Sequence, residues 1–322
     1  MGFLKKVIKY LLPYFATEIY HKINEKRLLE EALENEKRQR EERIEKVLKE
    51  ALEEEWDYKN ISYNKKIITI QDVCDCIDVY CKMYTYKDKD YYMRHAFRYF
   101  VTLYYVIKYN LHTGRILQVD DMTSFFAYLM KYFLEVDKMA YLYCDLRKPV
   151  EPAHLFGDLQ IPFEPGGGQF DVIICMEVFE HIMDTDVLAT FTFNGLKTML
   201  NSFWKLLNEN GKVLITTPNS CGVFSLSNLL HSKNPLMWVF HPREYTPNEI
   251  KEILRAFNYE IDLLNTEYLF EENYYKNGML LLLKDNYFDI KHRGDNIFMI
   301  ARKPPNKIFN MDVNINDILI KQ

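Results

Sequence analysis

The strongest constraint on the fold is a change of sequence pattern after Gly114. From there on, short apolar runs alternate with segments of helical periodicity. The runs expected as strands are 115–119, 139–144, 170–175, 212–216 and 296–301, and the segments expected as helices are 123–133, 196–207 and 247–257. Such alternation is typical of a parallel sheet with helices on both faces. We therefore predict an α/β domain over residues 114–304.

Residues 1–57 differ from that domain and predict an amphipathic, charged helical arm. Near the start, apolar side chains recur at helical spacing with Lys5, Lys6 and Lys9 between them. This pattern fits an anionic membrane surface as well as it fits packing against a partner or the chain's own core. The charged stretch from Lys22 to Trp56 has an apolar seam that breaks between residues 34 and 43. It predicts either a stalk or oligomerisation arm or a solvated helix. Because the apolar seam is broken, the pattern does not establish a long coiled coil.

Two further segments flank the predicted domain. Residues 58–113 are rich in tyrosine and carry a second helical stripe, which predicts a helical lead-in that packs on the core. The last segment, 305–322, reads as a polar C-terminal tail.

Charge and cysteine usage limit the partners and the compartment. The formal net charge is -5, which argues against nucleic acid because phosphate binding needs a clustered excess of Lys and Arg. A small molecule or a glycan is the expected partner. The six cysteines are scattered, no secretory signal is recognised, and no apolar run reaches the length of a membrane span. We expect a cytoplasmic protein, with contact at the inner membrane surface if the arm binds lipid.

One group of cysteines is a candidate metal site by its spacing. Cys74 and Cys76 are followed by Cys81, but a fourth ligand is missing and the stretch looks helical. Structural zinc generally has four ligands. Buried, inert thiols are the preferred interpretation.

Three segments, in order, resemble the class I S-adenosylmethionine-dependent methyltransferases. Residues 161–181 read IPFEPGGGQFDVIICMEVFEH, residues 206–219 read LLNENGKVLITTPN, and residues 241–250 read HPREYTPNEI. They are similar to the branch that contains ubiquinone-biosynthesis O-methyltransferases and glycan methyltransferases. The resemblance implies a Rossmann-like sheet, S-adenosylmethionine as cofactor, and a site beyond the carboxyl ends of the strands.

The resemblance also implies where the cofactor lies. Asp145 takes the position of the acidic residue that holds the ribose hydroxyls. The stretch Gly157, Asp158 and Leu159 resembles the one that brackets the adenine. Met176, at the end of the fourth strand, is expected at the methionine end of the cofactor, with Glu177 beside it.

The first cofactor loop departs from the family pattern. Members of the family have an acidic residue followed by a glycine-rich turn, because the backbone passes close to the cofactor. Here Gln118 occupies the position of the acidic residue, and Asp120, Met122 and Ser124 occupy the three glycine positions. Two outcomes remain open: Asp120 or Asp121 takes over the contact to the cofactor's ammonium group, or the domain has kept its shape and lost its ligand.

His181 is the leading candidate for a catalytic base, since imidazole titrates near neutral pH. Its alternative is a packing or capping role. Glu177, Glu180, His181 and His241 also resemble the magnesium site of some relatives, in which the ion gathers two neighbouring hydroxyls. Without a metal, His241 is expected to cap a helix that begins near Thr246, or to contact the acceptor. Thr246, Pro247 and Glu249 form a helix-start signature in their own right.

These features predict an S-adenosylmethionine-dependent O-methyltransferase acting on a small hydroxylated acceptor. The resemblance points to a surface-glycan sugar as one such acceptor. The alternative is a catalytically inactive, methyltransferase-like scaffold that acts through its helical N-terminus, by membrane contact or homo-oligomerisation.

Overall fold

The computed structural model describes Glu34, Arg38 and residues 60–84, 88–120, 125–136, 139–143, 170–182, 193–239, 241–269 and 276–319. The chain divides into two compact units, Met1–Trp56 and Asp57–Gln322, and the account below concerns the second. The predictions made for the arm, 1–57, lie outside the described residues except at Glu34 and Arg38, which are helical and exposed. Those predictions remain untested.

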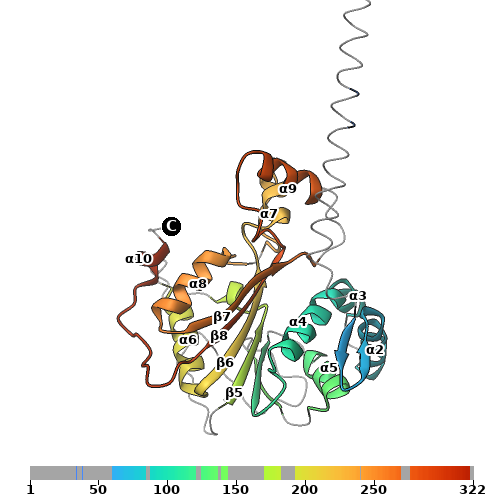
Figure 1. Ribbon diagram of the computed structural model, residues 1–322, viewed down its shortest axis with the longest axis vertical. Helices are drawn as coiled ribbons and strands as arrows, with labels where there is room; N and C mark the ends of the chain where they lie inside the picture. The colour runs from blue at the N-terminus through green and yellow to red at the C-terminus, as the bar shows by residue number, and fades with distance from the viewer. Residues whose placement is uncertain are drawn as a thin grey trace, which may run out of the picture. The chain divides into compact units, whose positions relative to one another are not determined.

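A six-stranded sheet forms the centre of the second unit (Figure 1). Its strands are β3 (Ile116–Asp120), β4 (Met139–Tyr143), β5 (Phe170–Met176), β6 (Leu207–Pro218), β7 (Glu260–Glu267) and β8 (Asn296–Arg302). The spatial order is β4-β3-β5-β6-β8-β7, in which the first four strands are parallel and β8 runs antiparallel to both neighbours. The predicted α/β class is confirmed.

Helices cover the two faces of this sheet, as Figure 1 shows. On one face lie α2 (Ile70–Met83), α3 (Lys89–Arg94), α4 (Ala96–Lys108) and α5 (Phe125–Leu134); on the other lie α6 (Asn194–Leu206), α8 (Pro247–Ala256) and the short α10 (Ile315–Leu319). Alternate residues of β5 serve the two faces: Ile174 packs in the first core, and Ile173 and Cys175 pack in the second. Because successive strand side chains point to opposite faces, a strand with two covered faces reads as a continuous apolar run.

Helix α2 carries Cys74, Cys76 and Cys81 and packs them toward the first core. Burial, the largest cause, with Asp72 and Asp75 nearby, raises the pKa of the Cys76 thiol to about 12. A thiol this hard to ionise is a poor metal ligand, since the thiolate is the ligand form.

Several elements were not foreseen. Residues 58–113 begin with a hairpin, β1 (Ile61–Tyr63) and β2 (Lys66–Ile68), whose turn places Asn64 and Lys65 at positive φ. The segment expected as a polar tail includes Phe309, which stacks on Phe257 with ring centroids 4.6 Å apart.

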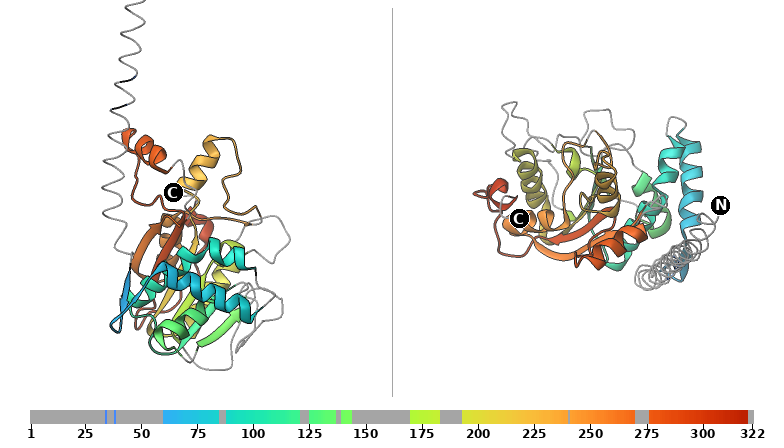
Figure 2. Two further views of the ribbon diagram at one scale, coloured as in Figure 1. Left: turned by 90° about the vertical axis from the view of Figure 1, so that its right-hand side faces the viewer. Right: turned by 90° about the horizontal axis from the view of Figure 1, so that it is seen from above.

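Two helices project beyond one end of the sheet. These are α7 (Val223–Leu230) and α9 (Lys276–Asp285), which lie together in Figure 1 and in the left view of Figure 2. They share a small apolar cluster around Val223, Met279 and Leu280. Within the described residues, no helix has both the length and the apolarity to cross a membrane.

Candidate active site at the carboxyl edge of the sheet

Strands β3 and β5 end at the same level, and β6 continues two residues further, to Pro218. In the sheet register, Asp120 lies opposite Met176, and Met176 lies opposite Thr216. After β3 the chain forms β4 on one side of β3 and then β5 on the other side, so the strand order reverses at β3. Ligands of open parallel sheets bind beyond the carboxyl ends of the strands at such a reversal.

Glu177 follows β5 directly and is held by three side chains. Its carboxylate accepts hydrogen bonds from the Thr216 hydroxyl, at 2.8 Å, and from the Asn296 amide, at 2.7 Å. The guanidinium of Arg98 lies 2.9 Å from its other oxygen. The residue has a positive φ of 52°, which a side chain other than glycine rarely adopts. These contacts hold the turn after β5 in place.

Arg98 comes from α4, in the segment before the sheet, and is 5% exposed. Burial alone disfavours the charged guanidinium, but Glu177, with Tyr91 and Tyr99, outweighs burial and raises the pKa of Arg98. The ion pair with Glu177 is therefore charged and enclosed.

Glu180 and His181 lie on η2 (Phe179–His181), a single turn of 3-10 helix after Glu177. Glu180 is buried and accepts a hydrogen bond of 2.7 Å from the Thr217 hydroxyl of β6. His181 is half-buried. Burial, the largest cause, and the neighbouring His241 lower the pKa of His181, against an opposite effect of Glu177. The ring is consequently neutral at pH 7, the form that accepts a proton or binds a metal.

His241 approaches from the segment between α7 and α8. Its ring centroid is 4.9 Å from that of His181, and the Trp238 indole packs against both rings, at 5.6 Å from His181 and 5.4 Å from His241. The Nδ1 atom of His241 is 2.7 Å from the carboxylate of Glu244. Thr246, not His241, caps α8 in a full capping box with Glu249, which confirms the predicted helix start. The capping alternative for His241 is wrong.

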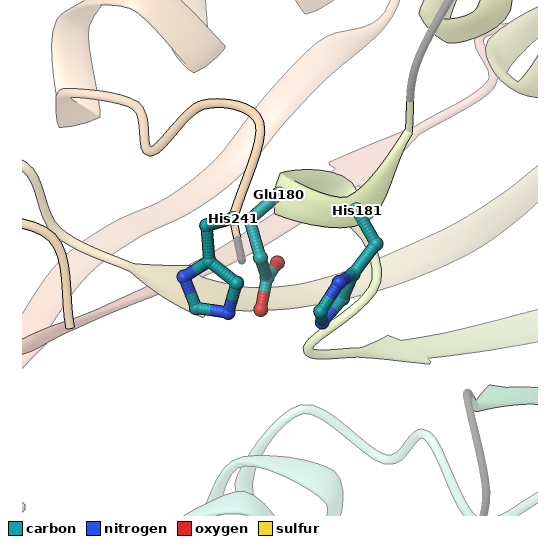
Figure 3. A group of neighbouring side chains, drawn as sticks. All are labelled: Glu180, His181 and His241. Carbon is teal, nitrogen blue, oxygen red and sulfur yellow. The ribbon is translucent and has the colours of Figure 1, made fainter. Parts of the chain in front are cut away.

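Figure 3 shows the carboxylate of Glu180 between the rings of His241 and His181. Ligand atoms of these three residues all lie within 4.8 Å of one another. The structure thus brings together three of the four residues predicted as metal ligands. Glu177 is not part of the group, because Arg98, Thr216 and Asn296 engage its carboxylate.

The predicted cofactor contacts are described only in part. Gln118 lies inside β3 and is fully buried, and Met176 is buried at the end of β5. Asp120 ends β3. Met122, Asp145, Gly157, Asp158 and Leu159 lie outside the described residues, and the predictions for them remain untested.

Sequence reasoning missed Arg98, Trp238 and Glu244. Arg98 sits within an apolar helical stripe, and nothing in that pattern marks its reach toward β5. Glu244 follows His241 by three residues, and this spacing is the one signal that pairs them.

Residues 129–264 of the chain match a sequence family described as a methyltransferase domain. No curated protein matches the chain in sequence.

The solved structures similar to this chain share little sequence identity with it. A SAM-dependent methyltransferase from Archaeoglobus fulgidus shares 14% identity at a TM-score of 0.44, covering 67% of this chain and 100% of its own. A possible histamine N-methyltransferase from Thermotoga maritima shares 14% identity at a TM-score of 0.44, with coverages of 72% and 99%. The plantazolicin methyltransferase BpumL, in complex with a desmethyl analogue and SAH, shares 14% identity at 0.42, with coverages of 73% and 98%.

Proposed function

We propose that the chain is an S-adenosylmethionine-dependent O-methyltransferase for a small hydroxylated acceptor, with a surface-glycan sugar as one candidate. The supporting observation is the meeting of two imidazoles and a carboxylate, on His181, His241 and Glu180, at the carboxyl edge of the sheet. A hydroxyl must lose its proton to become a good nucleophile, whereas an amine does not need a base of this kind. A site in which burial lowers the pKa of the His181 imidazole therefore fits an oxygen acceptor.

In this mechanism each residue has one task. When bound, S-adenosylmethionine supplies an electrophilic methyl group on a positively charged sulfur. His181 would accept the proton of the acceptor hydroxyl on a ring nitrogen, so that the oxygen could receive the methyl group. Trp238 packs on both imidazoles and limits the directions from which an acceptor can approach. Positioning of this kind supplies much of the rate in two-substrate reactions.

The same three residues fit a divalent metal, but their chemistry argues against the predicted magnesium. Magnesium prefers oxygen ligands and keeps several waters, whereas imidazole suits manganese, cobalt, nickel and zinc. With Glu177 engaged by Arg98, the group offers one carboxylate and two imidazoles. Glu180, His181 and His241 would hold such a transition-metal ion. His181 would then act as a ligand in place of a base, and the ion would lower the pKa of the acceptor hydroxyl.

The metal proposal is tested by titrating the full chain with MnCl2 under calorimetry. We expect binding that is stronger than that of MgCl2 and that falls at least tenfold in Glu180→Gln and in His241→Gln. His231→Gln, which alters an exposed histidine outside the group, serves as the matched control. Equal affinity in wild type and all three variants would refute the assignment of the ligands.

Catalysis is tested by release of S-adenosylhomocysteine with vicinal diols, namely catechols and free sugars, as acceptors. Removing a general base typically costs 10²–10⁴-fold in rate. We expect His181→Ala to lose at least a hundredfold, and His231→Ala to remain at the wild-type rate. Turnover that survives His181→Ala would exclude His181 as the base.

The second candidate function is a scaffold without catalysis. It is favoured by the sequence at the end of β3 and just after it, where Asp120, Met122 and Ser124 occupy positions that hold glycine in the family. On this hypothesis residues 1–57 carry the activity, through homo-oligomerisation or contact with a membrane surface. Sedimentation of the full chain, alone and with anionic vesicles, tests these two modes.

A further inference from the structure

The carboxylate of Glu244, to which the sequence analysis assigned no role, lies behind His241. The Nδ1 atom of His241 is 2.7 Å from Oε1 of Glu244, and the two residues are 9% and 5% exposed. The same Oε1 accepts the backbone N–H of Met237 at 2.6 Å. Its other oxygen, Oε2, is buried and has no hydrogen-bond partner in the described part of the chain. Glu244 therefore directs its bonding to His241 and to the segment that precedes it.

The chemistry of this contact fixes the tautomer of the ring. A carboxylate only accepts hydrogen bonds, and a neutral imidazole carries one N–H. In the neutral form of the ring, the proton of His241 therefore sits on Nδ1, and the lone pair is left on Nε2. Figure 3 shows one ring nitrogen of His241 turned toward the carboxylate of Glu180 and the other turned away. Since Nδ1 faces Glu244, the nitrogen toward Glu180 and His181 is Nε2.

Glu244 is itself held in place from both sides. The next residue, Tyr245, is buried and packs on Phe179 of η2, and its carbonyl accepts the N–H of Ser220 after β6. The hydrogen bond from the Met237 N–H joins Glu244 to the residue that precedes Trp238. The carboxylate thus links Met237 to His241, and the neighbouring Tyr245 fixes Glu244 at the end of β6.

We propose that Glu244 is a positioning residue: it holds His241 as the Nδ1–H tautomer and so presents the Nε2 lone pair to Glu180 and His181. This inference deepens the proposed function, because a lone pair in that place can bind a metal or accept a proton. The ring orientation itself follows from the Glu244 contact alone, whether or not a metal binds. Carboxylates that orient metal-binding histidines in this way typically change metal affinity 10–100-fold.

The test reads the tautomer directly. Full-length protein is labelled with ¹⁵N at its eight histidines, and long-range ¹H–¹⁵N spectra are recorded at pH 8, with His241 assigned by its loss in His241→Gln. We expect the Nδ1–H pattern in wild type. Glu244→Gln should keep this pattern, because its amide oxygen still accepts from both donors, while Glu244→Ala should shift His241 toward the Nε2–H form.

Two results would overturn the proposal: an Nε2–H tautomer in wild type, or an unchanged tautomer in Glu244→Ala, as expected if the residue only stabilises the fold. Should Glu244→Ala not fold, wild type and Glu244→Gln still decide the question. A MnCl2 titration of the same samples separates this inference from the proposed function. An Nδ1–H tautomer without manganese binding would retain the positioning role and reject the metal.

Discussion

Two carboxylates three residues apart, Glu177 and Glu180, end up in opposite chemical situations. Glu177 is saturated: a buried guanidinium, a hydroxyl and an amide all point at its oxygens. Glu180 accepts a hydroxyl from Thr217 and faces two imidazoles. The two residues are of the same type, but the fold places one in an ion pair with Arg98 and the other beside two imidazoles.

The difference lies in charge as much as in geometry. The ion pair of Arg98 and Glu177 cancels charge inside the protein, so removing one partner leaves the other buried and uncompensated. Around Glu180 the neighbours are two imidazoles, whose ring nitrogens can bind a cation. The first region is expected to govern stability, and the second to govern binding.

The largest expected effect comes from making the same substitution at both positions. Glu177→Gln leaves the guanidinium of Arg98 without a countercharge and should lower the free energy of unfolding by about 3–5 kcal/mol. Glu180→Gln keeps an oxygen that accepts from Thr217 and should change it by less than about 1 kcal/mol. Urea denaturation measures both, and equal losses would remove the distinction between the two regions.

The second prediction separates the pair from its surroundings. The double variant Arg98→Met/Glu177→Gln should lose less free energy of unfolding than the sum of the losses in the two single variants. The reason is that the guanidinium left without a partner in Glu177→Gln is removed. Residues in one buried network typically couple by about 0.5–3 kcal/mol. A double-mutant cycle that shows strict additivity would mean that Arg98 and Glu177 do not stabilise each other.

The third prediction concerns acid. Burial, the largest cause, with Arg98 and Arg94 nearby, lowers the pKa of His95 to about 3 from an ordinary value near 6.5. Between these values the unfolded chain binds a proton that the folded chain excludes, so stability is lost as the pH falls from about 6.5 toward about 3. We expect His95→Gln to reduce this loss by on the order of 1–3 kcal/mol. If the free energy of unfolding falls by the same amount in wild type and in His95→Gln over this pH range, the prediction is wrong.

The smallest expected effect is that of an exposed ion pair. Lys89 lies 2.8 Å from Asp78, with both side chains well exposed. Lys89→Met should change the free energy of unfolding by no more than about 1 kcal/mol, since such pairs contribute little in water. A cost as large as that of Glu177→Gln would show that pairing, and not burial, makes the Glu177 region sensitive.

Much of the sheet could be predicted because its central strands are covered on both faces and read as apolar runs. β7, at the edge, was missed: it mixes Glu260 and Asp262 with apolar residues, and its first half is partly exposed. The hairpin β1-β2 was missed because three-residue strands carry too little pattern. The start of α8 was predicted correctly, since a capping box is a local signal.

The site was predictable where local motifs carried it and not where the fold brought distant segments together. Glu180, His181 and His241 were singled out from motifs, and the structure places them side by side. Glu177 was assigned to the same group because the sequence cannot show that Arg98, 79 positions earlier, claims its carboxylate. Long-range polar partners of this kind have no signature in spacing or periodicity.

Calorimetric titration of the full chain with S-adenosylhomocysteine tests the central proposal, that the chain binds S-adenosylmethionine. We predict binding in the micromolar range, weakened by on the order of 2 kcal/mol in Asp145→Ala, which removes the expected ribose contact. Absence of heat at high protein concentration would contradict the enzymatic account and leave the scaffold as the function.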